Sequence, residues 1–332
     1  MKRRLLITAI SLGILIIANY SVPAGAQVSK SVVPLPPALA NLPKLEVEPW
    51  LRVDSQELFL EGPAFDRKGN LFVSSIFDNR ILKITPDKKV VTVFKQEGLL
   101  PDGIAIHRDG RLFLACLSGK VVAVNPDGSN MTEIKVKYQG FPRSANDLVF
   151  DSRGNLYVTD FIGTAADPKG GVYRYSADFK TIKPVFRNLA SANGIGLFPE
   201  GNVLWVTETG RNAIHRLQLL EDGVTIVPIA GSGIPYRFVG APGGCDSMAL
   251  DSKGNVYQAI IFQGRILILN SGGIPVAQVL IPGRDEGKLL RTTNVAFKPG
   301  TNEVYITASG KGGAWIYRFK GLAEGLRLFS HQ

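Results

Sequence analysis

The sequence predicts an all-β protein, a six-bladed β-propeller with four-stranded blades around a central channel. The first observation is a short pattern that occurs six times, roughly 41 to 53 residues apart. Each copy opens with an oxygen-bearing side chain, continues through small and apolar residues, and precedes a turn and an aromatic-rich strand. Repeats of this length, each holding several strands, are typical of propellers. The second observation is a content of 36 Gly and 20 Pro in 332 residues, which favours short strands and tight turns.

Equivalent positions in a propeller lie at one level around the axis, so the first residues of the six copies are expected to converge. They are Glu61, Asp102, Asn146, Asn193, Asp246 and Thr293. We therefore expect a ring of six oxygen donors in the channel.

Residues 1–26 have the pattern of a secretory signal peptide. A basic start at residues 2–4 precedes an apolar run over residues 5–18 and the small residues Ala24-Gly25-Ala26. We predict cleavage after Ala26 and export to a bacterial periplasm or beyond, with an uncleaved anchor as the alternative. No other segment is long and apolar enough to predict a membrane span in the mature chain.

The remaining chain divides into a Pro-rich linker over 27–44 and the propeller over 45–332. Residues 45–60 alternate weakly and are expected to supply a strand that closes the ring. In blade 1 the strands are expected at 62–65, 71–74, 80–84 and 90–94, with an Asp-x-x-Gly-Asn turn at 66–70 that recurs at 151–155 and 251–255. The longer connections 161–171 and 231–244 are expected to shape a substrate pocket, or to be surface excursions without a partner.

Charge and cysteine content limit the function classes. The formal charge is +10, but no run of Lys and Arg interleaved with aromatic residues occurs, which argues against nucleic-acid binding. Cys116 and Cys245 fall in opposite blades and are interpreted as separate, buried thiols, with a nucleophilic Cys245 as a lesser alternative. His107, His215 and His331 occupy unrelated registers and are interpreted as structural or exposed.

The ring offers the chemistry of a Ca²⁺ site. Glu61, Asn146, Asn193 and Asp246 provide two carboxylates and two amide carbonyls, the hard oxygens that Ca²⁺ prefers. Zinc is disfavoured because no His or Cys pair shares the phase. A polar lining of a water-filled channel, a Ca²⁺ that only staples the blades, and a second structural Ca²⁺ are left open.

Several segments resemble the senescence marker protein/gluconolactonase/luciferin-regenerating family of six-bladed propellers, and within it the bacterial drug-responsive lactonase branch. The resemblance runs from about residue 45 to the C-terminus and is carried by NDLVFDSRGNLYVTDFIG, ANGIGLFPEGNVLWVTET and ILIPGRDEGKLLRTTNVAF. It implies a catalytic divalent cation, usually Ca²⁺, with the ligands Glu61, Asn146, Asn193 and Asp246, and with Ser247 adding a ligand or a hydrogen bond. Sugar-lactone members often carry an Arg two residues before the blade-3 Asn. Here Arg143 lies three residues before it, which argues against gluconolactone as the substrate.

The resemblance implies hydrolysis of a small-molecule lactone by a polarised carbonyl and an activated water. Asp246 is the first candidate for the general base, followed by Asp147 and Asp102. Asp102, Ser247, Thr293 and Arg143 are expected to line the pocket around the ligands. The alternatives are a phosphotriesterase-like metal hydrolase, a non-catalytic ligand-binding propeller and a strictosidine synthase-like condensing enzyme.

Overall fold

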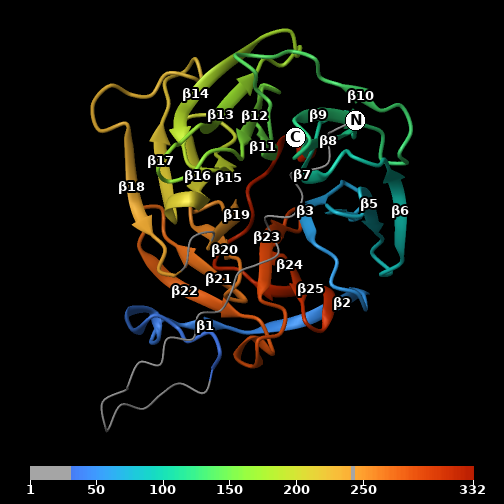
Figure 1. Cartoon of the computed structure of the whole chain (residues 1–332), viewed down its shortest axis with the longest axis vertical. Helices are drawn as coiled ribbons and strands as arrows, with labels where there is room; N and C mark the ends of the chain where they lie inside the picture. The colour runs from blue at the N-terminus through green and yellow to red at the C-terminus, as the bar shows by residue number, and fades with distance from the viewer. Residues whose placement is uncertain (1–30, 241–243) are drawn as a thin grey trace, which may run out of the picture. The chain divides into compact units, whose positions relative to one another are not determined.

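The computed structural model describes residues 31–240 and 244–332, in which six antiparallel sheets stand as blades around a central channel (Figure 1). The predicted all-β, six-bladed propeller is confirmed. Each innermost strand contacts the next, and the sixth contacts the first, so the ring is closed. These strands are β3 (Leu60–Phe65), β7 (Pro101–Ile106), β11 (Ala145–Phe150), β15 (Ala192–Leu197), β19 (Cys245–Leu250) and β23 (Arg291–Phe297).

From each inner strand the chain runs outward through antiparallel hairpins. The outer strands of blades 1 to 3 are β4 (Leu71–Ser75), β5 (Arg80–Ile84), β6 (Val90–Lys95), β8 (Leu112–Cys116), β9 (Lys120–Val124), β10 (Thr132–Glu133), β12 (Leu156–Asp160), β13 (Gly170–Tyr175) and β14 (Ile182–Leu189). Those of blades 4 to 6 are β16 (Val203–Glu208), β17 (Ala213–Gln218), β18 (Ser232–Arg237), β20 (Val256–Ile260), β21 (Arg265–Leu269), β22 (Pro275–Leu280), β24 (Glu303–Gly310) and β25 (Gly313–Lys320).

The ring is closed by a strand from the start of the propeller. β2 (Val47–Asp54) pairs antiparallel with β25 and forms the outermost strand of blade 6, as the alternation over 45–60 predicts. The two-residue strand β1 (Lys44–Leu45) adds a fifth strand to blade 5 by pairing parallel with β22. Just before it, the buried Leu39 packs against blade 5, and its carbonyl accepts a 2.8 Å hydrogen bond from the Gln278 amide.

The predicted signal peptide lies outside the described residues. Within 31–240 and 244–332, no helix has the length and apolar character needed to cross a membrane.

The recurrent turns after the inner strands are built as their sequence predicts. The Asp151 Oδ1 accepts the N–H groups of Arg153 and Asn155, at 3.0 and 2.8 Å, while Gly154 takes a φ of 84°. Each turn therefore leads the chain directly from an inner strand into the next strand of the blade.

The hydrophobic core lies between blades. Tyr157 of blade 3 packs with Leu204 and Val206 of blade 4, and Trp205 of blade 4 packs with Met248 of blade 5. The aromatic residues of the repeat thus pack between neighbouring blades. Cys116 and Cys245 are both free and buried, which confirms two separate thiols.

One predicted connection contains a strand. Residues 232–237 form β18, the outer strand of blade 4, although 231–244 was expected to be a long connection. The strand is hard to recognise because its residues are exposed or half-buried and include Gly and Pro, so it has no alternating apolar face.

Candidate metal centre

All six inner strands carry a register shift close to their second and third residues. In β11, Ala145 pairs with Asp160 and Leu148 with Val158, so two residues of β11 oppose the single residue Thr159. The strands β7, β15 and β19 shift at the same two positions. The shift in β3 falls at Gly62 and Pro63, and that in β23 falls at Thr293. A β-bulge re-aims the side chains at its position. In every inner strand except β3, the bulge includes the residue that carries the predicted oxygen donor.

The second residues of five inner strands form one buried polar cluster. Their exposed fractions lie between 3% and 6%, and each is linked to another by a hydrogen bond or by charge repulsion. This donor cluster consists of Glu61, Asp102, Asn146, Asn193 and Asp246.

Asp102 fixes the orientation of Asn146. The Asn146 amide nitrogen donates a 2.8 Å hydrogen bond to the Asp102 Oδ2. Because a carboxylate can only accept, the opposite atom of the amide, Oδ1, is turned away from Asp102. This Asn146 Oδ1 is buried and has no hydrogen-bond partner. A buried carbonyl oxygen without a partner is costly, and a bound cation is one of the few ways to satisfy it.

Asp246 and Asn193 form the second linked pair. The Asn193 side chain hydrogen-bonds to the Asp246 carboxylate, and the Ser247 hydroxyl lies 3.4 Å from the Asn193 Oδ1. The structure therefore brings Asp246, Asn193 and Ser247 together, as the sequence predicts.

Glu61 is held by a residue that the sequence reasoning did not select. The Asn294 amide donates a 2.9 Å hydrogen bond to the Glu61 Oε2, which also accepts the N–H of Gly62 at 2.8 Å. Asn294 follows Thr293, and the repeat phase placed the blade-6 donor at Thr293. The signal available was that the third positions of blades 3 and 5 are also polar, Asp147 and Ser247.

Thr293 and Arg143 serve neighbouring backbone instead of joining this cluster. The Thr293 hydroxyl donates to the Leu60 carbonyl at 2.7 Å and bonds to the Thr307 hydroxyl. The half-exposed Arg143 lies 3.6 Å from the Asp160 carboxylate and donates to the Lys169 carbonyl, so it is tied to the 161–171 connection.

Burial and mutual repulsion act on the carboxylates. Burial, followed by repulsion from Asp246 and Asp102, raises the pKa of Glu61 well above its usual value. Burial, followed by repulsion from Asp246 and Asp147, does the same for the pKa of Asp102. Burial raises the pKa of Asp246 to about 8, although the hydrogen bond from Asn193 lowers it. A cation among these groups would relieve the repulsion that raises these pKa values.

Each carboxylate oxygen of Asp147 accepts a hydrogen bond from a backbone N–H group. Oδ1 accepts the N–H of Leu148 at 2.8 Å, and Oδ2 accepts that of Ile195, in the next blade, at 3.3 Å. Burial nevertheless raises the pKa of Asp147 to about 6. The carboxylate thus joins blades 3 and 4 directly beneath the donor cluster.

Hydroxyl groups on the second strands support the bulges from behind. Thr159 accepts the N–H of Asp147 at 2.9 Å and donates to the Asn193 carbonyl at 2.6 Å, and Thr207 donates to the Asp246 carbonyl at 2.9 Å. The Thr in the Tyr-Val-Thr of β12 and in the Trp-Val-Thr of β16 was the signal in the sequence for this role.

Other reactive side chains are committed elsewhere. Burial raises the pKa of the Cys245 thiol far above its usual value, so the thiolate needed for nucleophilic attack is disfavoured. His215 bonds to Glu208 at 2.9 Å, and His107 packs edge-on against Phe150. We therefore interpret Cys245, His215 and His107 as structural residues.

The donor set fits an oxygen-seeking cation. In the described parts of the chain, no three His, Cys, Asp or Glu side chains are arranged to hold an ion by themselves. Glu61 and Asp246 instead combine with the amides of Asn146 and Asn193. That mixture suits Ca²⁺, whose shell accepts carboxylate, carbonyl and water oxygens.

These features define the molecule as a six-bladed β-propeller with a buried cluster of oxygen donors in its channel. The chain belongs to the SMP-30/gluconolactonase/LRE-like family, whose model matches residues 59–310. Lactonase drp35 of Staphylococcus saprophyticus is 46% identical over 304 residues, covering 89% of this chain and 93% of the relative.

Solved structures share the fold at lower identity. A luciferin-regenerating enzyme superimposes with a TM-score of 0.70 at 20% identity, covering 85% of this chain and 99% of the other. A calcium-binding protein, regucalcin, from Agrobacterium tumefaciens superimposes with a TM-score of 0.69 at 18% identity, covering 87% and 99%.

Proposed function

We propose that this protein is a hydrolase that opens a lactone at a divalent cation, with Ca²⁺ the favoured ion. Membership of the family and the 46% identity to a lactonase across nearly the whole chain support the reaction class. The description of regucalcin as calcium-binding supports the ion. The observation that carries the proposal is the unpartnered, buried Asn146 Oδ1 among carboxylates that repel one another. The proposed ligands are Glu61, Asn146, Asn193 and Asp246.

When bound, the cation supplies positive charge that polarises the lactone carbonyl. The chain supplies the remaining chemistry. Asp246 is the proposed general base: it takes a proton from water, whose oxygen then adds to the carbonyl carbon. The ring C–O bond breaks, the leaving oxygen is protonated, and the product is a hydroxy acid. Asp147 is the weaker candidate because both its oxygens already accept backbone N–H groups.

Residues around the donor cluster are proposed to position the substrate and the ligands. Asp102 holds the Asn146 amide, and Ser247 lies against Asn193. Arg143, anchored to Asp160 and half exposed, is proposed to contact the substrate as it approaches the cluster. Thr293 supports the strand beside Glu61 through its bond to Leu60.

We further propose that the mature protein begins at Gln27 and acts after export. The support is the basic, apolar and small-residue order of the first 26 residues. A reporter fused after Ala26 would be recovered outside the cytoplasm, and retention inside the cell would contradict the proposal.

The test uses the chain from Gln27, stripped with a chelator and assayed on aliphatic, aromatic and sugar lactones and on a phosphotriester, with and without Ca²⁺. We expect Ca²⁺ to restore lactone hydrolysis, and Asp246→Asn and Glu61→Gln to lose it by at least about 100-fold, the scale on which a catalytic acid or base contributes. The matched control is Asp127→Asn, a surface carboxylate that bonds only to Ser129.

The same assay separates the alternatives. Ca²⁺ binding without turnover of any ester would replace the enzyme by a ligand-binding propeller. Faster turnover of the phosphotriester than of every lactone would move the proposal to a phosphotriesterase.

A further inference from the structure

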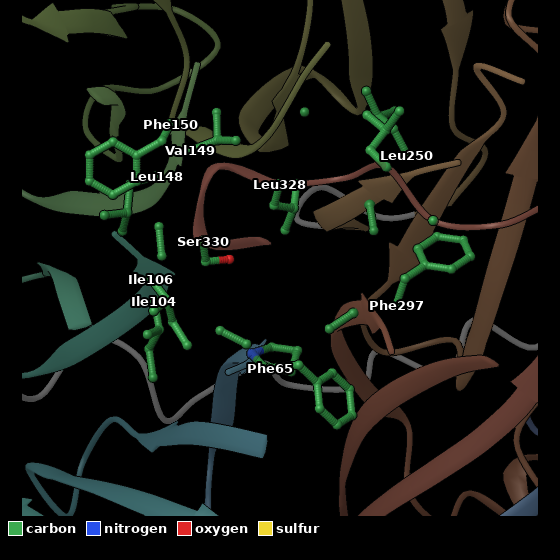
Figure 2. A pocket seen from close by; sticks show the side chains of 18 of the residues that line it. Phe65, Ile104, Ile106, Leu148, Val149, Phe150, Leu250, Phe297, Leu328 and Ser330 are labelled. Carbon is green, nitrogen blue, oxygen red and sulfur yellow. The ribbon is translucent and has the colours of Figure 1, made fainter. Parts of the chain in front are cut away.

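A second, distinct space lies in the channel beneath the donor cluster. It has a volume of about 130 Å³ and is lined by residues that follow the donor position in the inner strands of all six blades. Figure 2 shows Ile104, Leu148 and Leu250, from three different blades, around this space. None of the five residues of the donor cluster lines it. We call this space the lower chamber.

The lower chamber exists because one position of every inner strand is small. The last residues but one of the six inner strands are Ala64, Ala105, Val149, Gly196, Ala249 and Ala296, and all six line the chamber. Four of them keep some exposed surface although they lie at the centre of the molecule. A larger side chain at any of these positions would occupy the space. Each of the six repeats therefore contributes one of these residues to the chamber wall.

The C-terminal segment 325–332 closes the end of the channel away from the donor cluster. The N–H of Leu326 donates to the Leu250 carbonyl of blade 5, and the His331 Nε2 lies 3.2 Å from the Phe65 carbonyl of blade 1. Phe329 packs on Phe150 of blade 3, with ring centroids 5.5 Å apart. Leu328 of this segment borders the chamber in Figure 2.

The few polar groups at the chamber wall already have partners. Asp147 accepts two backbone N–H groups, and the Asn294 side chain bonds to Glu61 and to the N–H of Val295. Ser330 bonds to His331. A buried water needs two to four polar partners, and a cavity lined by aliphatic and aromatic side chains stays dry. The wall therefore favours an apolar occupant over water.

We infer that the lower chamber is a binding site for a small, neutral, apolar molecule about the size of benzene. An engineered cavity of about 150 Å³, lined by Leu, Ile and Phe in another protein, takes up benzene or xenon. A polar or charged molecule fits less well, because the side chains of Asp147, Asn294 and Ser330 already have hydrogen-bond partners. The site is separate from the proposed catalytic centre and independent of it.

Two measurements on the chain from Gln27 test this inference. Crystals under xenon pressure are expected to show a xenon atom between Ala105, Ala249 and Leu328. Saturation with benzene is expected to raise the Tm by on the order of a few degrees, because a ligand that binds only the folded state stabilises it.

A filling variant makes the assignment specific. Ala249→Leu is expected to remove the Tm shift with benzene, whereas Thr92→Leu, which adds apolar bulk on the exposed outer strand β6, keeps it. If Ala249→Leu fails to fold, Ala105→Leu in blade 2 serves the same purpose. Ordered water in place of xenon, or an equal benzene shift in the filling variant, would overturn the inference.

Discussion

The hydrogen bond from Asn146 to Asp102 determines which atom of the Asn146 amide remains free to bind a cation. The Asp102 carboxylate binds the nitrogen at 2.8 Å and leaves Oδ1 buried and unpartnered. An amide that is held in this way loses little rotational freedom when a cation binds, so Asp102 acts as a positioning residue. Partners of this kind commonly contribute a factor of 10 to 100 to metal affinity.

Asp102→Ala is therefore expected to weaken Ca²⁺ binding by about 10- to 100-fold while the fold is retained, because the Asn146 amide is then free to turn. Titration calorimetry on chelator-stripped protein measures this affinity directly. Asp109→Ala is the matched control in the same blade, since that carboxylate lies at the surface and binds Arg111. Unchanged affinity in Asp102→Ala would show that the hydrogen bond has no positioning role.

The carboxylates also make the cation-free protein sensitive to pH. Burial raises the pKa of Asp246 to about 8 in the folded protein, compared with about 3.9 in an unfolded chain. A raised folded pKa gives stability that is present below the unfolded value and is lost as the pH rises through the folded value. The Tm of the cation-free protein is thus expected to fall between pH 5 and pH 8.

Scanning calorimetry in the presence of a chelator measures this slope. Asp246→Asn should flatten it, and added Ca²⁺ should restore the Tm at pH 8, because the cation replaces the proton as the neutralising charge. A Tm that is constant or rises from pH 5 to pH 8 in the cation-free wild type would contradict the reasoning.

At the scale of the element, the bulge in each inner strand depends on the strand behind it. Thr159 accepts the N–H of Asp147 and donates to the carbonyl of Asn193, so one hydroxyl serves the backbone of two blades. The bulge removes these groups from the ladder, and the hydroxyl satisfies them.

Thr159→Val is expected to cost about 1–3 kcal/mol of unfolding free energy, because a buried donor and a buried acceptor lose their partner while the volume is kept. Thr159→Ser is the control, since it retains the hydroxyl. Urea unfolding monitored by fluorescence gives both values. Equal losses in the two variants would assign the role to packing by the methyl group instead.

The repeat explains what could be predicted from the sequence. One phase repeated six times predicts the strand order and the turns after the inner strands. It also predicts that the donors lie at a common level, namely Glu61, Asp102, Asn146, Asn193 and Asp246. Features outside that phase were missed. Asn294 lies one residue after the repeated donor position, and β18 has no alternating apolar face. The C-terminal segment 325–332 contacts the channel but is not part of the repeat, so the repeat does not predict its position.

At the scale of the whole molecule, the ring depends on one pairing between the two ends of the propeller. β2 pairs with β25, and Trp50 of β2 packs edge-on against Tyr305 of blade 6, with ring centroids 5.0 Å apart. Without β2, the edge of β25 would present unpaired N–H and C=O groups, which favour pairing with another chain.

A chain that begins at Ser55 is therefore expected to self-associate and to elute as large species in size-exclusion chromatography. A chain that begins at Val47 keeps β2, lacks the preceding residues including β1, and is expected to elute at the size of the folded propeller. Similar elution of the two chains would show that β2 is dispensable for closure.

The same pairing sets an order of events in the life of the chain. Residues 47–54 leave the ribosome early, but their partner strand at 313–320 is made almost last. At common rates of synthesis the first strand waits on the order of tens of seconds for the last. During that interval the ring is open, which would let the export proposed above begin before the propeller has closed.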